Sequence, residues 1–172
     1  QYYEVGILMS MLLRNCCNKV VTGIFGDEWK VIDLPKNNIL QNTDAIANRI
    51  GEVGYGTFGD KPLRWLIENK IVVDKVMYFT DMQFWEGRKY YNTILKCSYI
   101  DNTFANLWNE YKKISPQARL YLFDLAGYGY APISIPREDV TLIAGWSDKI
   151  FTILQSIENG SEALAKVQSI EL

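Results

Sequence analysis

Hydrophobic and polar positions follow two different periods along this chain, most regularly in its second half. Continuous apolar runs at residues 75–80, 119–125 and 140–145 predict buried strands. Residues 104–113 carry an aromatic stripe at helical spacing, and residues 148–158 are amphipathic. Because strands that alternate with helices form βαβ units, the pattern predicts an α/β fold with a doubly wound, mainly parallel sheet covered by helices on both faces.

The beginning of the chain predicts a helix followed by a hairpin. Residues 2–15 are apolar almost all round, which is typical of a helix packed between a sheet and its neighbours. Residues 19–26 are β-branched and aromatic, and residues 28–34 alternate. With Gly26-Asp27 between them, these two segments predict a hairpin at an antiparallel edge of the sheet.

Two more helices are expected before the first parallel strand. The first covers residues 42–50, with Asn42 or Thr43 as its N-terminal cap. The second covers residues 60–68, with Asp60 as its cap.

Composition and charge limit the classes of function that the chain can have. The 172 residues are 48% hydrophobic, which fits one globular domain, and no apolar stretch is long enough to span a bilayer. Eighteen basic and 20 acidic residues give a net charge of −2, which argues against a nucleic-acid-binding surface. Three cysteines without a CxxC spacing argue against zinc and favour a reducing, cytoplasmic location. The absence of histidine removes the Ser-His and Cys-His nucleophile pairs.

Two oxygen-bearing side chains are the main candidates for a site. Thr57 precedes the predicted helix at 60–68, and Asp81 follows the predicted strand at 75–80. Ligands of parallel sheets bind outside the carboxyl ends of the strands, where a hydroxyl and a carboxylate suit a hard cation such as Mg²⁺. The alternative is structural, because a threonine or an aspartate in such a position often caps a helix or a turn.

Three further residues are candidates for partner contact. Phe84 and Trp85 follow Asp81 in a predicted loop, where a pair of large aromatic side chains lines either a ligand edge or a local hydrophobic lid. Asp124 sits at the end of a predicted strand, and a structural cap is its default interpretation. Residues 86–101 fit no pattern and are interpreted as an insertion or an ordered loop beside this edge.

Gly54, Gly56 and Gly59 match the GxGxxG fingerprint of dinucleotide-binding proteins, but the context does not. The fingerprint must follow a strand, and the residues before Gly54 read as a helix. Asp124-Leu-Ala-Gly after a strand resembles an acidic element of GTPases, yet the chain has no P-loop to hold phosphates. Nucleotide binding is therefore not expected.

The candidate residues also resemble a known family. Gly56-Thr57 followed by Pro62-Leu63, the strand ending in Phe79-Thr80-Asp81, and the segment 142–147 (LIAGWS) resemble a von Willebrand factor A domain. The subtype resembles the C-terminal domain of Ro autoantigen (TROVE) proteins, which bind Y RNAs and misfolded small RNAs. In that family a metal-ion-dependent adhesion site combines a DxSxS motif with a threonine and an aspartate.

The resemblance implies how the site is completed. Thr57 and Asp81 would be its second and third elements, whereas the DxSxS strand expected before Tyr2 is missing and no such motif occurs later. The chain is thus expected to be a fragment, residues 1–172 forming one A-type domain. Mg²⁺ would bind poorly to it and well to a longer protein.

The function expected from these observations is binding without catalysis. The partner would be a protein, or a small RNA held through a missing N-terminal ring domain, and direct RNA binding by this chain should be weak. One alternative is a flavodoxin-like enzyme that uses Asp81, Asp124 and Mg²⁺ on a phosphorylated substrate. A purely structural domain without metal is another.

Overall fold

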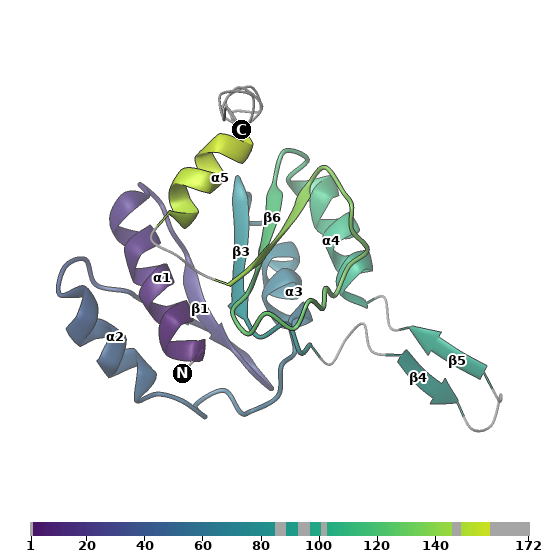
Figure 1. The fold of residues 1–172 in the computed structure, drawn as a ribbon, viewed down its shortest axis with the longest axis horizontal. Helices are drawn as coiled ribbons and strands as arrows, with labels where there is room; N and C mark the ends of the chain where they lie inside the picture. The colour runs from purple at the N-terminus through teal and green to yellow at the C-terminus, as the bar shows by residue number, and fades with distance from the viewer. Residues whose placement is uncertain (1, 85–88, 93–96, 101–102, 146–148, 159–172) are drawn as a thin grey trace, which may run out of the picture.

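The computed structural model of the protein describes residues 2–84, 89–92, 97–100, 103–145 and 149–158 (Figure 1). The helices are α1 (Tyr2–Cys16), α2 (Ile39–Ala47), α3 (Asp60–Glu68), α4 (Thr103–Ile114) and α5 (Ile150–Glu158). The strands are β1 (Thr22–Phe25), β2 (Trp29–Ile32), β3 (Lys75–Thr80), β4 (Lys89–Asn92), β5 (Cys97–Ile100), β6 (Arg119–Asp124) and β7 (Val140–Ala144). Over the described ranges, no helix has both the length and the apolar character needed to cross a membrane.

The central sheet has the strand order β3-β6-β7, and both pairings are parallel. Lys75 pairs with Arg119 at one end of β3 and Thr80 with Asp124 at the other. The middle strand β6 is buried along its last five residues, as expected for a continuous apolar run in a parallel sheet. The three predicted strands and their parallel arrangement are therefore confirmed.

Helices cover both faces of this sheet, because side chains of successive strand residues point to opposite faces. Tyr78, Leu120 and Leu122 pack on one face with α3 and α4. Tyr121 and Phe123 pack on the other face with Met9 of α1 and with α5. The mixed α/β, doubly wound class is confirmed.

The predicted N-terminal hairpin is present, but it is not an added strand of the parallel sheet. β1 and β2 are antiparallel, from Thr22 opposite Ile32 to Phe25 opposite Trp29. Within the described residues they form a two-stranded sheet of their own. Figure 1 shows β1 behind α1. The local pattern identified the hairpin, whereas its hydrogen-bonding neighbours depend on packing.

Both predicted helix caps are wrong. The N-cap of α2 is Asn38, and Thr43 lies inside the helix, where its hydroxyl donates to the Ile39 carbonyl oxygen at 2.8 Å. Asp60 is the first residue of α3 and follows Gly59, the N-cap. A threonine can bond the carbonyl one turn earlier in a helix as readily as it can cap one, so residue type alone did not locate these ends.

The segment between β3 and α4, which was predicted as an insertion or an ordered loop, contains a second hairpin. β4 and β5 pair antiparallel, from Lys89 opposite Ile100 to Asn92 opposite Cys97. Figure 1 shows this hairpin standing out from the body of the domain.

Candidate functional site

Three segments converge beside the carboxyl end of β3. The turn of the β1–β2 hairpin is tied to the loop before α3, because the Phe58 amide donates to the Gly26 carbonyl at 3.4 Å and the Glu28 amide donates to the Val53 carbonyl at 3.1 Å. That loop is tied to β3 by the Tyr78 hydroxyl, which donates to the Gly59 carbonyl at 2.9 Å. The hairpin turn, the loop and the strand end thus form one packed corner.

The three glycines of the GxGxxG sequence have a packing role in this corner. A Cβ at Gly54 or Gly56 would run into the carboxylate of Asp27 from the hairpin turn, and Gly54 also has a φ of +81°. A Cβ at Gly59 would lie 2.5 Å from the ring of Phe84. At each position a neighbouring side chain occupies the space that a Cβ would take, so close packing in this corner accounts for the glycines without a nucleotide.

Thr57 and Asp81 line the same cleft, and both are half-buried. The Asp81 carboxylate accepts the Gln83 amide at 3.1 Å and lies 3.4 Å from the Thr80 hydroxyl. Asp81 therefore also closes a turn after β3, as its structural interpretation required. Thr57 precedes the first residue of α3 by three positions and is not its cap.

The described residues do not complete a magnesium site. None of them form a group of three or more His, Cys, Asp or Glu side chains that could hold a metal ion. Thr57 and Asp81 would contribute one hydroxyl and one carboxylate, whereas Mg²⁺ requires near-octahedral oxygen coordination. Asp27, which the sequence pattern did not identify, places a second carboxylate at the corner. That carboxylate packs against Gly54 and Gly56 in the loop before α3.

Asp124 is an internal anchor. Its side chain is completely buried, and its two carboxylate oxygens accept the backbone amides of Ala126, Gly127 and Gly129 at 3.2, 2.8 and 2.7 Å. Three backbone donors satisfy a buried carboxylate and fix the start of the loop that follows β6. The prediction that Asp124 contacts a partner finds no support in this arrangement.

Phe84 is also internal, with 2% of its surface exposed. Its ring packs edge-on against Phe25 and Tyr78, with centroids 6.0 and 5.8 Å apart. The sequence left two interpretations of the aromatic pair, a ligand edge and a local hydrophobic lid. Phe84 is packed in the interior, which agrees with the second. Trp85 lies outside the described residues.

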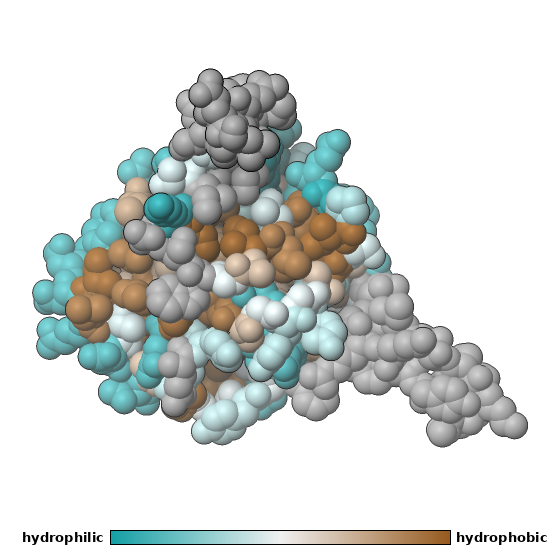
Figure 2. Space-filling model, in the orientation of Figure 1, coloured by the Kyte–Doolittle hydropathy of each residue, from teal (hydrophilic) through white to brown (hydrophobic). Residues whose placement is uncertain are grey.

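A large cleft separates the hairpin from the central sheet. It has a volume of about 1660 Å³ and is lined by β1, β3, α1 and α3, with Thr57 and Asp81 among its residues. Figure 2 shows hydrophobic residues gathered in a band over the region of α1 and the sheet strands. The oxygen-bearing candidates thus belong to a mostly apolar cleft, and they do not form an isolated polar pocket.

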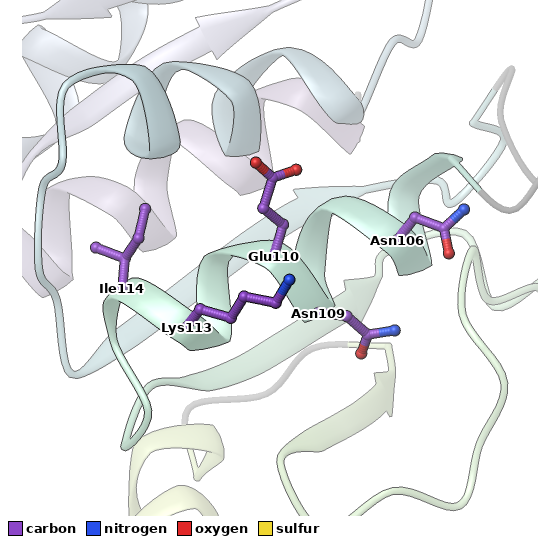
Figure 3. A pocket seen from close by; sticks show the side chains of 5 residues that line it. All are labelled: Asn106, Asn109, Glu110, Lys113 and Ile114. Atoms are coloured by element: carbon purple, nitrogen blue, oxygen red, sulfur yellow. The ribbon is translucent and has the colours of Figure 1, made fainter.

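A second, smaller hollow lies along α4. It measures about 430 Å³ and is lined by Asn106, Asn109, Glu110, Lys113 and Ile114 (Figure 3). All five residues come from one helix, and Asn109 accepts a hydrogen bond from Arg137 at 3.0 Å. A set of polar side chains on a single exposed helix face is what a solvated surface shows.

The fold and its strand-end corner define a doubly wound α/β domain. Among solved structures, the chain is similar to the crystal structure of the Ro (RSR) protein of Deinococcus radiodurans, with a TM-score of 0.65. The match covers 91% of this chain at 13% sequence identity. No family model and no curated protein sequence matches the chain.

This similarity shows that the domain has a Ro-like fold. The matched region is 29% of the Deinococcus Ro chain, so this chain spans less than a third of that protein. At 13% identity the likeness concerns the fold and does not extend to the residues of a site.

Proposed function

We propose that this Ro-like domain binds a partner at the carboxyl end of β3 and that a divalent cation such as Mg²⁺ takes part in that contact. The supporting observation is that Thr57 and Asp81, which lie 24 positions apart in the sequence, line one cleft. The described residues offer too few ligands for a resident ion, so the remaining oxygens come from outside them. The partner is a protein, or an RNA held mainly by another part of a Ro-like assembly.

Binding is favoured over catalysis by the positions of the acids. An enzyme using Asp81 and Asp124 together would need both carboxylates in one pocket. Asp81 lines the cleft, whereas the Asp124 carboxylate is enclosed by the backbone amides of its own loop. Only one of the two acids is therefore available to a ligand.

Manganese titration followed by nuclear magnetic resonance tests the cation site, because Mn²⁺ uses the oxygen ligands of Mg²⁺ and broadens nearby signals. We expect weak binding, with broadening centred on the amides next to Thr57 and Asp81. Asp81→Asn should remove it. The matched control is Asp74→Asn at the opposite end of β3, which should leave it unchanged. Equal broadening in the Asp81 variant would place the ion elsewhere and overturn the proposed site.

Direct RNA binding should be weak because the chain has a net charge of −2, and phosphate contacts carry most of the affinity for nucleic acids. A filter-binding titration with single-stranded and structured RNA measures this. A submicromolar complex that resists salt would contradict the proposal that RNA is held by another part of the assembly.

A further inference from the structure

The loop that joins β6 to β7 presents exposed aromatic and aliphatic side chains at the carboxyl edge of the sheet. Its first residue, Leu125, donates its amide to the Thr80 carbonyl at 2.9 Å, so the loop begins beside the end of β3. Tyr128 is 50% exposed, Tyr130 65% and Ile135 42%. Apolar side chains scattered singly over a surface are normal, whereas those gathered together mark an interaction site.

Three anchors hold this loop in place. At its start, the Asp124 carboxylate accepts three backbone amides of the loop. In the middle, Ile133 is 5% exposed and belongs to the same core cluster as the buried side chains of α4. At its far end, Arg137 and Asp139 form an ion pair. A loop anchored at its start, middle and end has little conformational entropy to lose when a ligand binds.

The strand before the loop has a neighbour on each side. The sheet order β3-β6-β7 places β6 in the middle, with parallel partners on both of its edges. The exposure of the two tyrosines therefore belongs to the loop itself and does not come from an unpaired strand edge.

The glycines on either side of Tyr128 leave open space at the surface. Gly127 and Gly129 have φ of +72° and +75°. Apart from its two chain neighbours, a Cβ at either position would meet no heavy atom of the described residues within 4 Å. The glycines of the GxGxxG sequence make room for a neighbouring side chain, whereas these two border solvent. The exposed tyrosines are thus flanked by notches that a ligand can enter.

The loop carries no charge. Residues 125–136 (LAGYGYAPISIP) contain no Asp, Glu, Lys or Arg. A nucleic acid is held mainly through Lys and Arg contacts to its phosphates, so this loop does not fit one. Uncharged surfaces with tyrosine are typical of the cores of protein interfaces. The ligand that fits is therefore an uncharged segment of a polypeptide.

We propose that Tyr128 and Tyr130 bind a proline-rich segment of a partner polypeptide in the polyproline II conformation. Such segments are recognised by aromatic-lined surfaces, on which proline rings pack without help from charge. A polyproline II segment has no internal hydrogen bonds, so its carbonyls can accept the exposed tyrosine hydroxyls. Because the loop and the segment are both preformed, few contacts suffice for binding.

Peptide binding at this loop goes beyond the proposed function and can be tested apart from the cation. The peptide needs the side chains of Tyr128 and Tyr130, whereas the cation needs those of Thr57 and Asp81. Manganese broadening should therefore be unchanged in tyrosine variants that have lost the peptide. A chain that binds manganese but no peptide would refute only the peptide site, and the reverse result would refute only the cation site.

The experiment titrates the 172-residue chain with the synthetic peptide acetyl-APPLPPLPPA-amide. Calorimetry should show saturable binding, and the largest amide shifts in nuclear magnetic resonance should fall within residues 126–136. The matched control peptide, acetyl-AGSLGSLGSA-amide, keeps both leucines but lacks the preformed conformation, and it should bind at least about tenfold more weakly.

Substitutions of the two tyrosines are unlikely to disturb folding because both side chains are exposed. Tyr128→Ala and Tyr130→Ala should each lower the affinity for the proline peptide at least about tenfold. The phenylalanine variants keep the ring and lose only the hydroxyl, so their affinity should fall about threefold. Tyr55→Ala is the matched control, because Tyr55 is 82% exposed in another loop, and its affinity should stay within about twofold of the original.

Four results would overturn the proposed peptide site. Neither peptide binds at concentrations up to about 1 mM. The proline and glycine-serine peptides bind equally, which would indicate nonspecific apolar contact. The variant with both Tyr128→Ala and Tyr130→Ala binds the proline peptide as tightly as the original chain. In sedimentation, the chain forms dimers that this double variant does not form and that the peptide does not dissociate, which would make a second copy of the chain the occupant.

Discussion

The strand β6 ends at Asp124, whereas Asp81 follows the last residue of the neighbouring strand β3, and the two carboxylates have different surroundings. Asp124 is fully buried and accepts three backbone amides, whereas Asp81 is half-buried, accepts one, and lines the large cleft. Asp124 belongs to β6, the middle strand of the three-stranded sheet, whereas Asp81 follows β3 at the edge of that sheet. In the register of the sheet Asp124 lies opposite Thr80, so Asp81 lies one residue beyond the paired strands, where its carboxylate lines the cleft.

The loop after β6 is held at both ends by carboxylates. At its far end, Asp139 accepts the Arg137 guanidinium through two bonds of 2.9 Å and the indole N–H of Trp108 at 2.8 Å. In the turn after β3, the Asp81 carboxylate contacts the Gln83 amide and the Thr80 hydroxyl. We therefore expect the loss of a carboxylate in the loop after β6 to lower the free energy of unfolding more than the loss of the Asp81 carboxylate.

The largest effect is expected for Asp124→Ala. The substitution leaves the amides of Ala126, Gly127 and Gly129 without their acceptor in a buried site and should lower the free energy of unfolding by about 3 kcal/mol or more. Urea denaturation measures the change. An effect under about 1 kcal/mol would mean that water replaces the carboxylate and that the two strand ends are equivalent.

Asp139→Ala should have the next largest effect. It removes the acceptor of the fully buried Trp108 indole N–H, with an expected loss of about 2 kcal/mol in urea denaturation. Arg137→Ala is the matched control, because it breaks the ion pair but leaves the indole acceptor in place, and it should lose less than half as much. Equal losses would assign the stabilisation to the ion pair.

The stability of the same anchor should depend on pH. Burial raises the pKa of Asp139, but hydrogen bonds from Arg137 and Trp108 outweigh it, so the pKa lies below its usual value. A depressed folded-state pKa stabilises the protein above the unfolded value of about 3.9, and this contribution is lost as the pH falls through the folded value. The difference in stability between the chain and Asp139→Asn should shrink when denaturation is repeated at pH 6, 4 and 3. A difference in stability that stays constant over this pH range would contradict the prediction.

The smallest effect is expected for Asp81→Ala. Only the Gln83 amide and the Thr80 hydroxyl lose a partner, at a half-exposed position, so the free energy of unfolding should fall by about 1 kcal/mol or less. Differential scanning calorimetry beside Asp124→Ala checks this. A loss as large as that of the Asp124 variant would make Asp81 a structural anchor and weaken its proposed role in cation binding.

The contrast between Asp81 and Asp124 also shows which features the sequence pattern could predict and which it could not. The strands β3 and β6 are apolar and of the same length, and the sequence pattern predicted both strands and their parallel pairing correctly. The same pattern gave Asp124 and Phe84 a role in partner contact, although both are enclosed by loop and aromatic neighbours from distant parts of the chain. Such neighbours are not encoded in local spacing.

The sequence by itself determined the α/β class, the three parallel strands and the first hairpin, because side-chain periodicity reports which faces of an element are buried. Only the tertiary structure decided that the hairpin stands apart from β3, that Gly54, Gly56 and Gly59 make room for Asp27 and Phe84, and that Thr57 and Asp81 line one cleft. These features depend on contacts between segments far apart in the chain, and the hydrogen bonds and packing volumes that fix them arise only when those segments meet.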